Sequence, residues 1–154
     1  MGLRRAPRTE NFQLDPVLDF MRLLWSVEHG LQRMSKKMES DLGITGPQRL
    51  VLRVVGRFPD MSAGELAHIV RLHPSTITGI LQRLVGRGLI ERKRDPDDSR
   101  RARLRLKASA VPYTRTSPGT VERVVTMALD KAGAANVRAA RKVLTAVAEG
   151  LNEL

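Results

Sequence analysis

Arginines surround three aspartates in the stretch RDPDDSRR, residues 94–101. Arginine binds phosphate oxygens through paired N–H bonds, so clustered arginines favour a polyanionic partner. The aspartates would repel such a partner, but Asp-Pro and Asp-Asp-Ser are also typical of a tight turn. A carboxylate beside an arginine can fix the rotamer of that arginine. The stretch is therefore either a solvated turn that dilutes the charge or a turn whose aspartates orient the arginines.

Small polar side chains form a second group, between residues 74 and 83. Hydroxyl and amide groups can bond base edges and phosphates, whereas a guanidinium far from the helix start is better suited to phosphate. Alone, the pattern fits an ordinary solvated helix face, but a basic hairpin nearby favours DNA. We expect DNA contacts from Pro74, Ser75, Thr76, Thr78, Gly79, Gln82 and Arg83.

The residue types needed for catalysis or metal binding are missing or scattered. The absence of cysteine excludes a disulfide scaffold and cysteine-ligated zinc. His68 and His73 lack an acidic cluster, and neither a glycine-rich phosphate loop nor a pair of catalytic acids is present. We expect no enzyme, no metal and no cofactor.

The composition indicates a globular protein with a polyanionic partner. The chain has 154 residues, 42% of them hydrophobic, and a formal net charge of +11. Such an excess of positive charge is typical of proteins that bind nucleic acid. Because no run is long and apolar enough to span a membrane, we expect a cytoplasmic protein without a membrane partner. Residues 1–13 read as a basic, disordered arm.

Helix-start signals divide the first half of the chain. A long helix is predicted from Asp15-Pro16 to about residue 43, since aspartate caps helices and proline suits the first turn. Capping boxes at residues 45–48 and 62–65 open two short helices. Residues 73–75 open a third, which Gly86 ends.

A change of period follows these helices. Residues 103–107 alternate strictly between charged and apolar, which predicts a half-buried strand, and residues 89–93 are the plausible partner. Residues 44–107 would then form a helix-turn-helix followed by a hairpin, or wing. A winged helix-turn-helix places its second helix in the major groove. The wing residues expected at DNA are Arg94, Asp98, Ser99, Arg100 and Arg101, and Thr45, Gln48 and Arg49 are expected at phosphates.

Long helical segments at both chain ends, residues 14–43 and 108–154, predict a dimer. The second is interrupted at residues 117–119 and ends in apolar residues spaced alternately three and four apart. Such faces need a partner surface, and we expect the interface at Leu14, Leu18, Val137, Ala140, Leu144, Val147 and Leu151. Arg22, Trp25 and His29 could hold an aromatic carboxylate, although a lone tryptophan on such a helix is more often part of a core.

The segments TGPQRLVLRVV, SAGELA and HPSTITGILQRLVGRGLIERKRDPDDSRRARLRL together resemble the multiple-antibiotic-resistance regulator (MarR) family of bacterial transcription factors. The resemblance extends from about residue 14 to the C-terminus. It implies a mainly helical fold, with a winged helix-turn-helix flanked by terminal dimerisation helices. It also implies pseudo-palindromic operators, and DNA release by a small ligand, often an aromatic acid. By this resemblance, Asp98 braces the wing through Arg94 or Arg100.

Three functions are compatible with these features. The leading hypothesis is a dimeric, sequence-specific transcriptional regulator that binds double-stranded DNA, with repression the expected direction. The first alternative is an architectural protein that binds DNA without sequence preference. The second is a winged-helix interaction module that no longer binds DNA, which Ser99 in place of a basic residue at the tip would favour.

Overall fold

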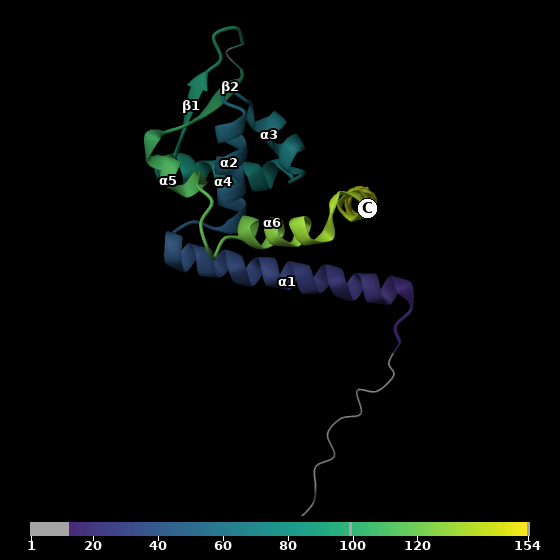
Figure 1. The fold of residues 1–154 in the computed structure, drawn as a ribbon. Helices are drawn as coiled ribbons and strands as arrows, with labels where there is room; N and C mark the ends of the chain where they lie inside the picture. The colour runs from purple at the N-terminus through teal and green to yellow at the C-terminus, as the bar shows by residue number, and fades with distance from the viewer. Residues whose placement is uncertain (1–12, 99, 154) are drawn as a thin grey trace, which may run out of the picture.

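The computed structural model describes residues 13–98 and 100–153 (Figure 1). Ser99 and nearly all of the predicted basic arm therefore lie outside the described residues. The elements in chain order are α1 (Pro16–Leu42), α2 (Gly46–Arg57), α3 (Ala63–Val70), α4 (Pro74–Gly86), β1 (Ile90–Arg94), β2 (Ala102–Leu106), the 3₁₀ turn η1 (Ala108–Ala110), α5 (Val111–Thr114), α6 (Val121–Ala132) and α7 (Ala134–Asn152).

Local capping explains where the first helices begin. Asp15 Oδ1 accepts from the backbone N–H groups of Val17 and Leu18, at 2.9 and 3.1 Å. Thr45 and Ser62 each form a complete capping box, as the sequence predicts. Each cap satisfies donors that the first turn leaves without an intrahelical partner.

The two strands form an antiparallel hairpin in which Arg92 faces Leu104. Each strand lies one residue from its predicted position: β1 starts one residue later and β2 one residue earlier. A short segment before α3 flanks β2, because Leu104 exchanges backbone hydrogen bonds with Asp60 and Met61 at 2.9 Å. The wing is thereby tied to the helix-turn-helix through the backbone of Leu104, in the middle of β2.

A single aliphatic core joins α2, α3, α4 and the hairpin. Its fully buried members include Val51, Leu52, Leu66, Ile77, Leu81, Leu84, Ile90 and Leu104. Ala110 of η1 lies in the same core, and Tyr113 of α5 packs against it. Residues 108–114 thus belong to the winged-helix body, and the predicted boundary at residues 107/108 falls inside a packed unit.

The terminal helices leave this body at the end opposite the hairpin. In Figure 1, α1 and α6 lie alongside each other, and α7 turns away from α6 at Gly133, whose φ is 77°. The break in helix that the sequence predicts around Pro118 separates α5 from α6. Within the described ranges, no helix is long and apolar enough to cross a membrane.

Candidate nucleic-acid interface

Helix α4 separates an anchoring face from an exposed polar face. Ile77, Leu81 and Leu84 are almost completely buried against the other helices. On the opposite face, the polar residues predicted to contact DNA are exposed, and only Gly79 is half-buried. The helical period that buries every third or fourth residue therefore presents these side chains together.

Two of the exposed hydroxyl groups on α4 are already hydrogen-bonded. Thr78 Oγ1 donates to the backbone oxygen of Pro74 at 2.9 Å. Ser75 Oγ lies 2.7 Å from Nδ1 of His73. Thr76 and Gln82 are exposed as well. Because the hydroxyls of Ser75 and Thr78 are already engaged, Thr76 and Gln82 are better placed to meet base edges.

The hairpin presents its basic residues on two faces. Arg92 and Arg94 lie on the same face of the hairpin as the buried Ile90 and Leu104. These two arginines extend that face beyond the core. The other face carries Arg103 and Arg105. At the tip, Arg100 and Arg101 are exposed.

Asp95 organises the tip of the wing. Arg103 donates Nε–H to Asp95 Oδ2 at 2.8 Å and Nη2–H to Oδ1 at 3.1 Å. Asp95 Oδ1 also accepts from the backbone N–H groups of Asp97 and Asp98, at 2.9 and 3.4 Å. The Asp95 side chain is only 13% exposed. The hydrogen bond from Arg103 leads the causes that hold the pKa of Asp95 below its usual value of 3.8.

A second ion pair fixes the base of the wing. Arg105 binds both carboxylate oxygens of Asp60 through Nε and Nη2. This hydrogen bond leads the causes that lower the pKa of Asp60. Asp60 has a φ of 70°, which a residue with a side chain rarely adopts. The pair therefore fastens β2 to a backbone turn that is itself strained.

The prediction that Asp98 braces the wing through Arg94 or Arg100 is wrong. Asp98 Oδ1 accepts from the backbone N–H of Arg100 at 3.0 Å, and Oδ2 lies 3.9 Å from Nε of Arg101. Neither the Arg94 nor the Arg100 side chain is paired with it in the described part of the wing. The brace between carboxylate and guanidinium belongs to Asp95 and Arg103, and Asp98 closes the turn.

The phosphate contacts expected of Gln48 and Arg49 are also wrong. Gln48 is 6% exposed and Arg49 only 2%. Gln48 and Thr45 are held in the capping box. The Arg49 guanidinium donates to Glu122 Oε1 at 2.7 Å and to the backbone oxygens of Tyr113 and Arg115. Arg49 therefore joins α2 to the segment that leads into α6, and its buried guanidinium is not available to a ligand outside the protein.

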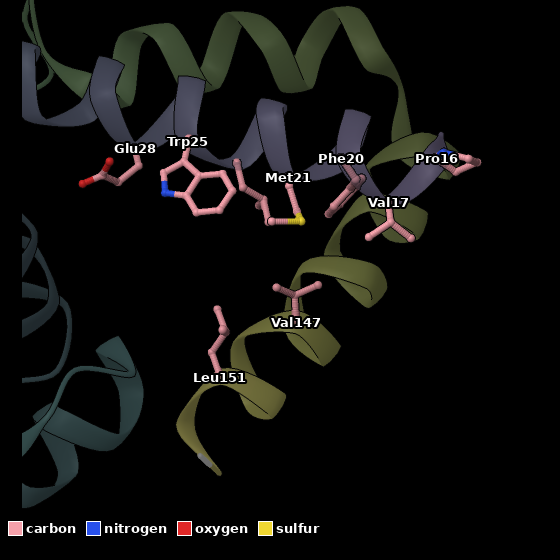
Figure 2. A pocket seen from close by; sticks show the side chains of 9 residues that line it. Pro16, Val17, Phe20, Met21, Trp25, Glu28, Val147 and Leu151 are labelled. Carbon is pink, nitrogen blue, oxygen red and sulfur yellow. The ribbon is translucent and has the colours of Figure 1, made fainter. Parts of the chain in front are cut away.

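Arg22, Trp25 and His29 do not form the expected ligand pocket. An open apolar groove of about 720 Å³ lies between the start of α1 and the end of α7, and of these three residues only Trp25 lines it. Figure 2 shows Trp25 and Met21 on α1 across from Val147 and Leu151 on α7, with Glu28 at the rim. Arg22 is paired instead with Asp19 at 2.6 Å. An acidic rim does not suit the aromatic carboxylate that these three residues could have held, and Trp25 is 60% exposed rather than part of a core.

The residues predicted at the dimer interface lie on the surface of the single chain. Leu144 is 47% exposed and Leu151 67%. Leu14, Leu18 and Ala140 are exposed as well, and Val137 and Val147 are half-buried. Apolar side chains of this size are therefore available to a partner.

Sequence reasoning missed Asp60, Asp95 and Glu122. For Asp95 a signal was present: continuing the strand alternation from residues 91 and 93 places residue 95 on the same face as residue 103. For Asp60 and Glu122 there was none, because their partners lie 45 and 73 residues away in the chain.

Comparisons with known proteins agree with this geometry. Residues 42–101 match the sequence model of the MarR family. An uncharacterised HTH-type transcriptional regulator of Bacillus subtilis, YsmB, is 30% identical over 93 residues, which are 60% of this chain and 64% of the relative. The chain thus spans less than two thirds of the length of this relative.

Solved structures share the fold over most of the chain. The PcaV transcriptional regulator from Streptomyces coelicolor, in complex with its natural ligand, has 25% identity and a TM-score of 0.71, covering 90% of this chain and 98% of its own. A mutant MarR from E. coli, complexed with operator DNA, has 24% identity and a TM-score of 0.67, covering 85% and 94%. By the family match over residues 42–101, and by the wing and helix-turn-helix that these residues build, this part of the chain is similar to the winged helix-turn-helix of the MarR family of transcriptional regulators.

Proposed function

We propose that this chain is a dimeric, sequence-specific DNA-binding repressor. The observation that carries the proposal is the exposed polar face of α4 beside a wing in which half-buried carboxylates pair with Arg103 and Arg105 while Arg100 and Arg101 stay exposed. Helices of this kind read base edges in the major groove, and arginines on wings reach phosphates or a narrow minor groove. The E. coli and Staphylococcus aureus proteins of the same fold were solved in complexes with DNA.

The terminal helices support the dimer. Apolar side chains on α1, α6 and α7 are exposed, among them Val17 at 67%, Trp25 at 60% and Met127 at 58%. Large apolar side chains that are exposed together on neighbouring helices are typical of a protein–protein interface. A two-fold dimer would present two copies of α4 to two half-sites of a pseudo-palindromic operator.

Regulation by a small molecule is a further part of the proposal. Its support is the similarity to PcaV, which was solved with its natural ligand. The expected result is release of the selected DNA site by one compound of a small-molecule panel. Unchanged DNA affinity across the panel would remove this part and leave DNA binding intact.

Two substitutions on the two parts of the interface test the proposal. Arg100→Ala should weaken binding to selected and random DNA alike, and lower the slope of log affinity against log salt by about one, since one phosphate contact is lost. Thr76→Ala should instead reduce the preference for the selected site over random DNA. If both variants bind with wild-type affinity and salt slope, α4 and the wing are not the DNA-binding surface.

A further inference from the structure

His73 caps the N-terminus of α4 with its side chain. Its backbone has φ −59° and ψ 140°, outside the helix. The backbone N–H of Ser75 points to His73 Nδ1 at 3.2 Å, and Ser75 Oγ lies 2.7 Å from the same nitrogen. Nδ1 of His73 therefore lies within hydrogen-bond distance of both the backbone N–H and the hydroxyl of Ser75.

This geometry determines where the ring carries its proton. A backbone N–H can only donate, so Nδ1 of His73 must accept. The neutral ring then carries its proton on Nε2, and the Ser75 hydroxyl donates its own proton to Nδ1. A doubly protonated ring has no acceptor left, and the Ser75 N–H would lose its partner.

Histidine is not among the residues that usually cap helices, which are Ser, Thr, Asp and Asn. The other side-chain caps of this chain follow that rule, with Asp15, Thr45 and Ser62. An aspartate at position 73 would bring a negative charge to the end of a helix that faces phosphates. The imidazole supplies the same acceptor without that charge.

We propose that His73 is a positioning residue for DNA binding: its neutral imidazole holds the first turn of α4, and protonation of the ring releases it. The proposal rests on the proposed function of α4 as the recognition helix. The turn that His73 holds carries Thr76, the exposed residue expected to distinguish the operator from random DNA. Losing a side-chain cap typically corresponds to about a fivefold change in an equilibrium.

The charged groups around His73 come from three elements. His73 lines an open groove of about 540 Å³ with His68 of α3, Arg71 of the following turn, Glu149 of α7 and Glu153 just after that helix. Arg71 thus brings a positive charge to this groove, and the two glutamates bring negative charges. Arg71 Nη1 lies 3.4 Å from Glu149 Oε1, so two of these charges are paired with each other.

The groove provides a matched control. His68 has the same imidazole group in the same groove, but it belongs to α3 and is not the cap of α4. His73→Asn retains a side-chain acceptor that no longer titrates in this range. His73→Leu removes the acceptor at every pH.

The DNA experiment measures the affinity of the full chain for a selected site and for random DNA at one salt concentration. Measurements at about pH 7.5 and about pH 5.5 lie on either side of the range in which imidazoles ordinarily titrate. The wild type and His68→Asn should lose about fivefold of their preference for the selected site on acidification. His73→Asn should keep its preference at both values, and His73→Leu should lack it at both. The proposal is overturned if His73→Asn loses preference like the wild type, or if His73→Leu equals the wild type at the higher pH.

A second measurement needs no DNA. Two-bond ¹H–¹⁵N spectra of the histidine rings in the full chain, near pH 7.5, report which ring nitrogen carries the proton. A proton on Nε2 of His73 supports the cap, and a proton on Nδ1 overturns it. If the chain selects no DNA site, the proposed function fails, and the spectra still decide whether His73 holds the helix.

Discussion

At the scale of single residues, the largely buried Asp95 and the exposed Asp97 play different parts in the wing. Asp95 is largely buried and engages one guanidinium and two backbone N–H groups. Asp97 is 88% exposed and lies 3.5 Å from the same guanidinium, which makes it a peripheral neighbour. The aspartates of RDPDDSRR therefore organise the turn from within, and the arginines at positions 100 and 101 remain outside.

Asp95→Asn should weaken DNA binding even though it removes a negative charge from a DNA-binding surface. An asparagine amide has one oxygen and cannot accept both hydrogen bonds from Arg103. The wing tip would then be less ordered in the free protein and would have to be ordered when DNA binds. An ordering cost of about 0.5–1.5 kcal/mol corresponds to a loss of about two- to twelvefold in affinity. The measurement is affinity for the selected site at one salt concentration.

Asp97→Asn is the matched control, with the same change of charge two residues away. It should bind DNA as tightly as the wild type or slightly more tightly. Tighter binding by Asp95→Asn as well would mean that the acids only dilute the positive charge.

The pKa directions predict how the wing responds to acid. Hydrogen bonds from Arg103 and Arg105 lower the pKa values of Asp95 and Asp60 below 3.8. A lowered folded-state pKa contributes stability above the unfolded value, and that stability is lost as pH falls through the folded value. The wing should therefore stay intact at pH 5 and loosen below about pH 4. Carboxyl ¹³C shifts of both residues check this, and midpoints above 3.8 would contradict the ion pairs.

At the scale of elements, the sequence predicted what local chemistry decides. Both capping boxes and the aspartate cap of α1 are visible within four residues, and the structure confirms them. The hairpin was found but displaced by one residue, because alternation does not show where pairing ends. The burial of Arg49 was invisible, since its partners lie 64 to 73 residues away.

Arg49→Ala should destabilise the connection between α2 and α6. Glu122 has one buried carboxylate oxygen without a partner among the described residues. Its pKa is raised by burial but lowered overall by hydrogen bonds from its own backbone and from Arg49. Removing Arg49 takes away the partner at 2.7 Å and leaves this carboxylate only Arg53, at 3.4 Å. Breaking a buried pair costs about 3–5 kcal/mol.

Arg53→Ala provides the comparison for that substitution. Arg53 approaches the same carboxylate at 3.4 Å, but its side chain is 36% exposed. Its loss should cost at most about 1 kcal/mol. The measurement is the free energy of unfolding in urea, and equal losses for Arg49→Ala and Arg53→Ala would contradict the account.

At the scale of the whole molecule, the exposed apolar faces of the terminal helices predict a dimer. Leu144→Asp would place an unpaired charge in the proposed interface and should give monomers or insoluble protein. Leu50→Asp is the control, because Leu50 of α2 is 46% exposed against 47% for Leu144. Light scattering at micromolar concentration measures the oligomeric state. A soluble Leu144→Asp dimer would remove α7 from the interface.

The most direct test of the central claim is selection of bound sites from randomised double-stranded DNA by the full chain at fixed salt. A dimeric, sequence-specific regulator should select an inverted repeat whose half-sites lie about one helical turn, or 10 base pairs, apart. Thr76→Ala should alter the base preference within each half-site, and Arg100→Ala should leave the consensus unchanged. Recovery of DNA without a consensus, or of a single unrepeated site, would contradict a dimeric, sequence-specific regulator.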